Sequence, residues 1–453
     1  MQTGRGPVAW LGVLASPATA GGRLREWLTQ RTGGFARQVL VLLSGAVAGQ
    51  AISVLLSPAL TRLYNPDEFG WLSVYAAALY LLYAIASLRY EMALPITSDD
   101  DAGSNLLALC FLALVGTTFA LTLICWWFPT PWFAAIGLGA LSAYRYLLPL
   151  GFAITGAYYV LVYLATRQSA YSLLARTRIS QGLSGPLSQI ALGLAGCGKI
   201  GLAIGFIIGQ SSGTLLLARK LLLQPAGILK RISWGGILAA AHAYRDFPLY
   251  SSWAALLEAA GCGLILFPLV THFYASDIAG FIFLSDRVVG RPLTIVSASL
   301  LQVFVGEAGV AVRTAPAQVR RRFHQVVSRM AVLVAAWVLL ANIMAAALFG
   351  PLFGASWEAA VPYLHALSFG YWGAAVLHPV QHTLQLLERQ RIAAAWQVIR
   401  LLMVLLAVLG AVHLGWNAAS ALWAYSVAQG AACGAMVVII DRCILQLQRQ
   451  RAV

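Results

Sequence analysis

The chain has 453 residues, of which 60% are hydrophobic and only 10% are charged, and its mean hydropathy is +0.78. A soluble globular protein carries about 25% charged residues, so this composition excludes a soluble chain and indicates an integral membrane protein. The formal net charge of +15 is explained by membrane topology, as argued below, and we expect no nucleic-acid partner.

Twelve hydrophobic segments follow one another along the chain. A helix needs roughly 20 residues to cross a hydrocarbon core of about 30 Å, and each segment is long enough. We therefore predict an all-α membrane protein. Prolines at 149, 362 and 379 interrupt the fourth and tenth segments. The predicted spans are residues 37–60, 70–90, 105–128, 142–166, 179–197, 200–222, 247–271, 279–305, 325–349, 358–385, 391–413 and 416–440.

These spans divide the chain into two lobes of six helices joined by a linker. The linker contains Lys230, Arg231 and Trp234, and it resembles an amphipathic segment that lies on the membrane surface. We predict a cytoplasmic N-terminal tail at 1–34, an N-lobe at 35–224, a cytoplasmic linker at 225–244, a C-lobe at 245–441 and a cytoplasmic C-terminal tail at 442–453.

The basic residues predict the orientation in the membrane. With a cytoplasmic N-terminus, all but five of the 30 basic residues fall on the inner side, and the positive-inside rule therefore favours both termini in the cytoplasm. The exceptions are Arg62, Arg145, Lys199, Arg287 and Arg291. The segment Val8–Ala20 resembles a cleaved secretory signal, but cleavage there would reverse the charge asymmetry of every later loop.

One short sequence occurs twice. "TRLYNPDEFGW" begins at Thr61 and "THFYASDIAGF" begins at Thr271, and the two share Thr, Tyr, Asp and Gly at the same spacing. Each lies in an outside connection, between spans 1 and 2 or between spans 7 and 8. An offset of 210 residues superposes six helices on six in the same orientation, which is a parallel repeat about an axis along the membrane normal.

A parallel repeat predicts a cavity between the two lobes and transport by alternating access. Within the repeated motif, we expect the carboxylates of Asp67 and Asp277 to cap the helices that follow them. We expect Gly70 and Gly280 to let the incoming turn approach closely.

Longer stretches resemble a known family. "TRLYNPDEFG", "SLRYEMALPI" and "GLAIGFIIGQ" are similar to the bacterial polysaccharide flippases of the Wzx type, and the similarity covers about residues 35–441. That family belongs to the multidrug/oligosaccharidyl-lipid/polysaccharide (MOP) exporter superfamily, which also holds multidrug (MATE) exporters and lipid II flippases. The resemblance implies a MATE-like fold of twelve helices in two lobes.

The resemblance also implies a function. The cargo would be an undecaprenyl-diphosphate-linked oligosaccharide, moved from the inner to the outer leaflet of the bacterial inner membrane for O-antigen or exopolysaccharide synthesis. Membrane lipids and the polysaccharide polymerase or export machinery would be its partners. We expect a functional monomer without enzymatic activity or cofactor, driven if at all by an H⁺ or Na⁺ gradient.

Arginines inside the spans are the candidate ligands of the diphosphate, because a charged cargo in the bilayer core needs compensating charge. Arg287 and Arg291 are four residues apart and so share one face of a helix, where two guanidinium groups would grip a diphosphate through paired donors. The alternative is a structural ion pair, because Glu258 is expected at the depth of Arg291 and Asp286 is adjacent in sequence. Such a pair could also couple transport to an ion gradient.

Other residues are weaker candidates. Arg62 and Arg89 lie in the stretches that match the family and are candidate substrate contacts, although arginines near span ends usually extend towards lipid headgroups. His378 and His382 have the spacing of a helical metal pair, but no acidic partner is evident, and we expect a role in packing or cavity polarity. The six cysteines form no metal-binding pattern, and we predict no metal site.

Three other functions remain open. A drug or cation exporter of the same superfamily would need acidic residues in its cavity to bind a cation. The predicted spans hold at least as many arginines as acidic residues, which favours an anionic cargo. A lipid II flippase often has additional helices. A membrane glycosyltransferase or polymerase would use Asp67 and Glu68 as its acidic site, but the outside loops are short and the repeat would be unexplained.

Overall fold

The computed structural model describes residues 34–450, except residues 98, 136, 223–230, 315 and 388. Every regular element in this part of the chain is a helix. Residues 1–33 of the predicted N-terminal tail and residues 225–230 of the predicted inner linker lie outside the described residues. The outcome is an all-α membrane protein, as the composition predicts.

The first half contains six helical passes. In chain order its elements are α2 (Gly34–Leu55), α3 (Ser57–Leu63), α4 (Pro66–Tyr83), η3 (Tyr90–Ile96), α5 (Asp100–Trp127), α6 (Thr130–Ala135), η4 (Gly139–Tyr144), α7 (Leu147–Arg167), α8 (Tyr171–Leu194), α9 (Gly198–Ser211) and α10 (Thr214–Leu222). The pairs α2–α3, α4–η3 and α9–α10 each continue one pass across a break.

The second half repeats this plan with more irregular helices. Its elements are α11 (Trp234–Ala243), η6 (Phe247–Ser251), α12 (Ser252–Ala259), η7 (Ala260–Leu264), α13 (Leu266–Phe273), α14 (Ser276–Ser285), η8 (Asp286–Gly290), α15 (Arg291–Thr314), α16 (Pro316–Phe353), η9 (Ala355–Ala360), α17 (Val361–Leu377), η10 (His378–Val380), α18 (Thr383–Leu386), α19 (Gln390–His413) and α20 (Ala418–Gln450). The elements η6, η7 and η8 are π-helical turns.

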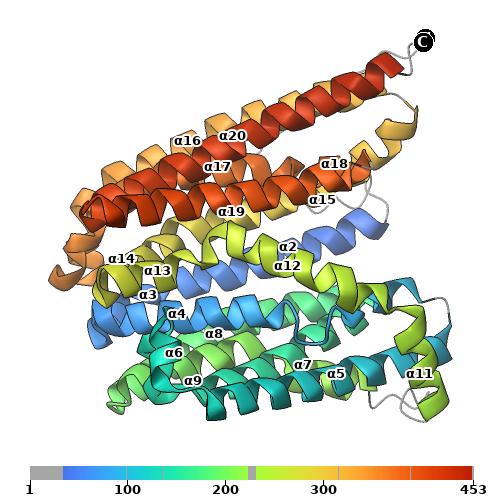
Figure 1. The fold of residues 1–453 in the computed structure, drawn as a ribbon, viewed down its shortest axis with the longest axis horizontal. Helices are drawn as coiled ribbons and strands as arrows, with labels where there is room; N and C mark the ends of the chain where they lie inside the picture. The colour runs from blue at the N-terminus through green and yellow to red at the C-terminus, as the bar shows by residue number, and fades with distance from the viewer. Residues whose placement is uncertain are drawn as a thin grey trace, which may run out of the picture.

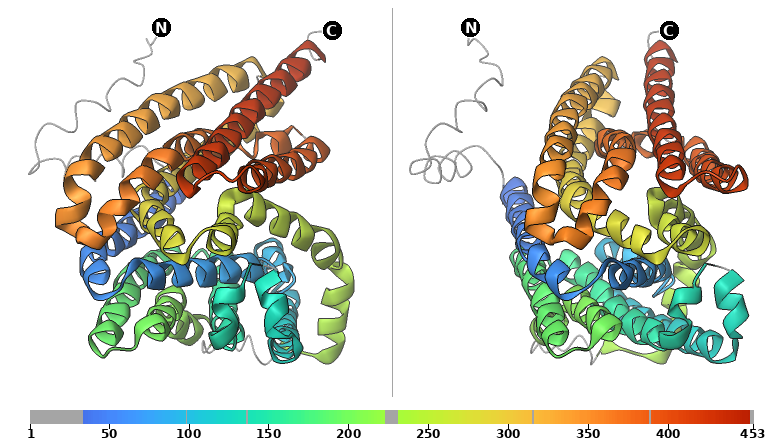
Figure 2. Two further views of the ribbon diagram at one scale, coloured as in Figure 1. Left: turned by 60° about the vertical axis from the view of Figure 1, so that its left-hand side comes forward. Right: turned by 90° about the vertical axis from the view of Figure 1, so that its left-hand side faces the viewer.

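The two halves form two lobes that meet along a central layer. Figure 1 shows the first half below and the helices α16, α17, α19 and α20 above, with α2, α12, α13 and α14 between them. Figure 2 shows the same separation from two other sides. The most extensive contact between the halves joins α4 to α14, the two helices that carry the repeated motif.

Seven helices in the described part of the chain are long and apolar enough to cross a membrane by themselves. They correspond to predicted spans 1, 3, 4, 6, 9, 11 and 12. The other five passes are α4, α8, α12–α13, α14–α15 and α17. The helices of these five passes are interrupted, or they are more polar than the seven, and all five passes line the central cavity described below.

One detail differs from the sequence prediction of the fold. The fourth pass begins later than residue 142, because α6 and η4 fill the connection before α7. The described part of the inner linker packs on the first half, since Ser233 N donates to Asn105 Oδ1 over 2.8 Å and Arg231 pairs with Asp101 over 3.1 Å; its place on the membrane surface stays a prediction. The lobe boundaries themselves stay predictions.

The expected helix caps are partly wrong. Asn65 is the N-cap of α4: its side chain accepts from Glu68 N over 2.9 Å, and the Glu68 carboxylate accepts from Asn65 N over 3.0 Å. This capping box leaves Asp67 free to bind Lys199, 2.7 Å away. Partial burial raises the pKa of Asp67, but the bonds to Lys199 and Ser276 outweigh it and hold the pKa below its ordinary value.

Candidate functional site

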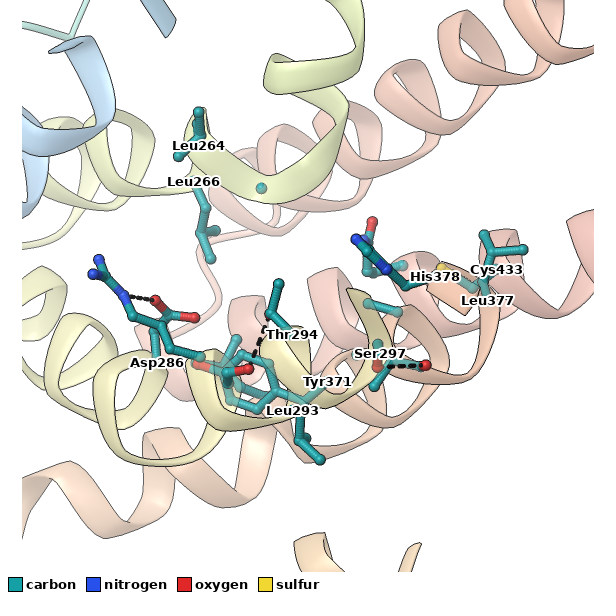
Figure 3. A pocket seen from close by; sticks show the side chains of 18 of the residues that line it. Leu264, Leu266, Asp286, Leu293, Thr294, Ser297, Tyr371, Leu377, His378 and Cys433 are labelled. Carbon is teal, nitrogen blue, oxygen red and sulfur yellow. Dashed lines mark hydrogen bonds and ion pairs between the residues drawn. The ribbon is translucent and has the colours of Figure 1, made fainter. Parts of the chain in front are cut away.

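A cavity of about 670 Å³ lies between the two halves. The first half contributes Gln50 from α2, Tyr80 from α4 and Arg178 from α8, and most of the remaining lining comes from the second half. Figure 3 shows part of it, with Leu264 and Leu266 on one side facing the helices that carry Asp286 and Thr294 on the other.

The first-half wall is polar and held by hydrogen bonds. Arg178 Nη1 donates to Gln181 Oε1, one helical turn further along α8, over 3.2 Å. Gln210 Nε2 from α9 donates to the Tyr80 hydroxyl over 2.6 Å. Because these partners fix both side chains, the wall presents a positioned guanidinium group and a phenol to the cavity.

Breaks in the helices shape the second-half wall. Gly263, at the end of the π-helical turn η7, has φ of +100° and separates α12 from α13. The turn η8 interrupts the next pass between α14 and α15. Such π-turns are frequent at functional sites, and here both lie beside the cavity.

One end of the cavity holds an ion pair. Arg291 Nε donates to Asp286 Oδ2 over 3.2 Å, and both side chains remain about one-third exposed. The Arg291 guanidinium also lies 5.4 Å from the centre of the Phe283 ring, a cation–π distance. Figure 3 shows Asp286 of this pair in the cavity wall, on the side that also carries Tyr371. The bond to Asp286 uses Nε, so the terminal nitrogens of Arg291 keep donors for a ligand.

Another part of the cavity carries Arg400 and His378. Arg400 from α19 is 5% exposed, and its Nε donates to Gln429 Oε1 from α20 over 3.3 Å. His378 lies near Ser297 in Figure 3, and its Nδ1 is buried without a hydrogen-bond partner among the described residues. His378 thus has the cavity role that the sequence allowed for it.

The charge of the cavity is positive. Its described lining contains Arg178, Arg291 and Arg400 but only one carboxylate, Asp286, which is already paired. Arginines in a site of low polarity bind phosphate groups through paired, charge-assisted hydrogen bonds. The arrangement therefore suits an anionic ligand better than a cationic one.

The structure separates Arg287 from Arg291. Arg287 is 7% exposed and is not part of the cavity lining; its Nη2 donates to the carbonyl and the hydroxyl of Ser53, over 3.2 and 3.0 Å. Gln50 Nε2 in turn donates to the Arg287 carbonyl over 3.3 Å. Arg291 therefore lines the cavity, whereas Arg287 is bonded to α2 of the first half.

The other expected site residues lie away from the cavity. Arg62 makes a long contact of 3.5 Å from Nη2 to the carbonyl of Pro351. Arg89 stands at the start of η3 with φ of +64°. Glu258 lies on α12 outside the cavity lining, and the ion pair of Arg291 is made with Asp286 instead. Their roles in transport stay predictions.

Sequence reasoning missed two of the three cavity arginines. The charge count placed Arg178 and Arg400 on the inner side of the membrane, but they lie within α8 and α19 and line the cavity. These helices are the fifth pass of the first half and the fifth of the second. The repeat does not single them out, because Arg400 lies 222 residues after Arg178 whereas the offset of the repeat is 210.

Known proteins share both the sequence family and the fold. The sequence model of a family described as "Polysaccharide biosynthesis protein" matches residues 59–362. No curated protein matches the chain. Solved structures are similar in fold at low sequence identity.

The first is the lipid II flippase MurJ in an inward closed conformation, with 11% identity, a TM-score of 0.69 and coverage of 91% of this chain and 90% of that one. The second is the MATE multidrug transporter DinF-BH in complex with R6G, with 13% identity, a TM-score of 0.66 and coverage of 91% and 97%. The third is an inward-facing MATE family transporter of the MOP superfamily, with 13% identity, a TM-score of 0.63 and coverage of 91% and 99%.

The TM-scores show a common fold despite the low identities, and they confirm the all-α, MATE-like architecture that the resemblance implied. The family match supports the resemblance noted in the sequence. Because the matched residues make up most of the chain, the protein belongs to the family of polysaccharide biosynthesis proteins.

Proposed function

We propose that the protein moves an undecaprenyl-diphosphate-linked oligosaccharide from the cytoplasmic to the periplasmic leaflet. The observation that carries this proposal is the cavity between the halves, to which both halves contribute arginines: Arg178 from the first, Arg291 and Arg400 from the second. A cavity shared by two lobes is accessible to either side in turn when the lobes rock.

The physical argument concerns the diphosphate. Its negative charge is costly to carry through hydrocarbon unless the protein supplies opposite charge and hydrogen bonds. Arg400 is nearly buried, and a buried guanidinium group gains most from an anionic ligand because water does not screen the attraction. The sugars would occupy the polar surface around Gln50 and Tyr80.

The charge of the site weighs against two alternatives. A cation exporter needs a free acid in its cavity, and Asp286 is engaged by Arg291. A glycosyltransferase was suggested by Asp67 and Glu68, but Asp67 pairs with Lys199 and Glu68 completes the cap of α4. A lipid II flippase would carry the same diphosphate, so the choice between these cargoes depends on the glycan and on experiment.

The remaining parts of the proposal concern placement and energy. The protein would be a monomer in the bacterial inner membrane with both termini in the cytoplasm. An H⁺ or Na⁺ gradient would act through Glu258 or Asp286. If Glu258→Gln left both transport and its pH dependence unchanged, a coupling role for Glu258 would be abandoned.

Complementation tests the function. The chain is expressed in a strain that lacks its own repeat-unit flippase, and surface polysaccharide is measured together with lipid-linked units held in the inner leaflet. We expect surface polysaccharide to be restored. Arg178→Ala and Arg400→Ala should each lower transport about tenfold or more, since a charge-assisted hydrogen bond contributes about 1.5–3 kcal/mol.

Each cavity arginine has a matched control on its own helix. Arg176 on α8 and Arg391 on α19 are exposed and outside the cavity lining, so Arg176→Ala and Arg391→Ala should transport normally at equal protein level. Equal losses in all four variants would contradict a role for the cavity. No restoration by correctly inserted protein with a matched glycan would favour drug export or lipid II transport, to be decided by cation resistance and by rescue of a lipid II flippase deletion.

A further inference from the structure

The two copies of the repeated motif touch each other across the lobes. A Cβ atom added to Gly70 in α4 would collide with the carbonyl oxygen of Ser276 in α14. A Cβ atom added to Gly280 in α14 would collide with the carbonyl oxygen of Pro66 in α4. Gly70 and Gly280 are 210 residues apart, and so are Pro66 and Ser276, so the contact is reciprocal under the repeat.

The expected role of these glycines is therefore corrected. They do not serve a turn within their own lobe. Each lets the backbone of its helix rest against the first turn of the helix from the other lobe, which a side chain at either position would prevent. The motif occurs twice because α4 and α14 make the same contact with each other, and each helix needs a glycine at that point.

Further bonds surround this crossing. Ser276 Oγ donates to the carbonyl of Asp67 over 3.1 Å. Trp357 in η9 is fully buried, and its Nε1 donates to the carbonyl of Thr61 over 3.0 Å. The Trp357 ring packs edge-on against Phe69 from the first half, at 4.9 Å, and against Phe281 from the second, at 5.9 Å. Both copies of the motif thus contribute to one cluster.

The cluster lies at one end of the molecule. α3 and α14 meet at the left-hand end of Figure 1, whereas α11 and the C-terminus lie at the right-hand end. With a cytoplasmic C-terminus, the left-hand end is the periplasmic side. The cavity begins further along the same helices, at Tyr80 of α4 and at Ile282 and Asp286 after Gly280.

We propose that the reciprocal contact of Gly70 with Ser276 and of Gly280 with Pro66, secured by Trp357, is the outer gate of the transporter. It is closed in this structure and must separate for cargo to leave. This inference rests on the proposed function and its topology. The contact is made by backbone atoms at two small residues, so a single added methyl group on either glycine disfavours the closed state specifically.

Cysteine labelling tests the gate without any cargo. In a variant with the native cysteines replaced, Thr294→Cys places a reporter in the cavity, where Thr294 is exposed and lines the wall. A membrane-impermeant maleimide is added to right-side-out spheroplasts or to inside-out vesicles. We expect Gly70→Ala and Gly280→Ala each to raise labelling from the periplasmic side severalfold and to lower it from the cytoplasmic side.

The matched controls are Gly116→Ala on α5 and Gly410→Ala on α19, because a Cβ atom at either position meets nothing within 4 Å. These should label as the parent does. Unchanged labelling in folded Gly70→Ala and Gly280→Ala protein would overturn the proposal, as would an equal change in the controls.

A cross-link tests the same gate without altering the glycines. Asp67→Cys and Ser276→Cys lie on opposite sides of the crossing, and a short reversible cross-linker should join them. We expect the cross-link to abolish complementation and a reductant to restore it. Full transport with the cross-link in place would overturn the gate. Failure of the uncross-linked chain to complement would instead count against the proposed function, and the labelling result would still decide the gate.

Discussion

Two arginines four residues apart in one pass have different surroundings in this protein. Arg291 lies in the cavity beside an acid, whereas Arg287 is buried against α2 and bonded to Ser53. The sequence could not distinguish them, because residue type and spacing are the same as for two ligands on one face. Their neighbours decide which one a cargo can reach, because Arg287 is bonded to Ser53 and Arg291 lines the cavity.

The bond from Arg287 to Ser53 predicts a loss of stability without a direct loss of cargo contact. Ser53→Ala removes one acceptor from a buried guanidinium group, whose Nε already has no partner among the described residues. We expect the free energy of unfolding to fall by about 1–3 kcal/mol, seen as a lower thermal midpoint of the purified protein in detergent.

Ser44 is the control on the same helix, since its exposed hydroxyl donates to the carbonyl of Val41 within its own helix. Ser44→Ala should leave the midpoint unchanged. If Ser53→Ala behaved like Ser44→Ala, the stability of the protein would not depend on this contact of Arg287 between the halves.

Among elements, irregular helices mark the cavity better than apolar ones do. Hydrophobic length predicted the passes, but in the described part of the chain only seven helices are long and apolar enough by themselves, and the other five passes are broken or more polar. The breaks at η7 and η8 could not be predicted, since each depends on which side chains the neighbouring helices supply. Those breaks place Leu264, Asp286 and Arg291 in the cavity wall.

The break at Gly263 can be tested by substitution. An alanine there would have to adopt φ near +100°, and its Cβ would lie 2.8 Å from the Tyr425 hydroxyl. We expect Gly263→Ala to lower the free energy of unfolding by about 1–3 kcal/mol, the range for strained backbone conformations, and to reduce complementation because the cavity wall shifts.

Gly261 in the same π-turn provides the comparison. A Cβ atom on Gly261 would meet Gln397 Oε1 at 3.6 Å, an ordinary contact, and its φ is not in the left-handed region. Gly261→Ala should therefore keep both thermal stability and transport. Similar losses for both variants would show that the turn is intolerant of any side chain, and the specific requirement for φ near +100° would be wrong.

At the scale of the whole molecule, the repeat and the charges predicted most of what the fold shows. Two copies of one motif predicted two lobes, and the solved MOP structures confirm the all-α, MATE-like architecture. The charge count placed Arg178 and Arg400 on the inner side, because it sums charges by sequence position and does not show which helical residues face a polar cavity. The predicted orientation of the protein in the membrane does not depend on those two residues.

Orientation gives the last prediction. Alkaline phosphatase is active only in the periplasm, so fusions report the side of each connection. We expect activity for fusions after Asn65 and Gly196, which precede α4 and α9, and none after Ser169, which precedes α8, or at the C-terminus. The reverse pattern would place the glycine crossing on the cytoplasmic side. The crossing would then be an inner gate, and the arginine cavity would receive its ligand from outside, which is incompatible with export of a lipid-linked sugar.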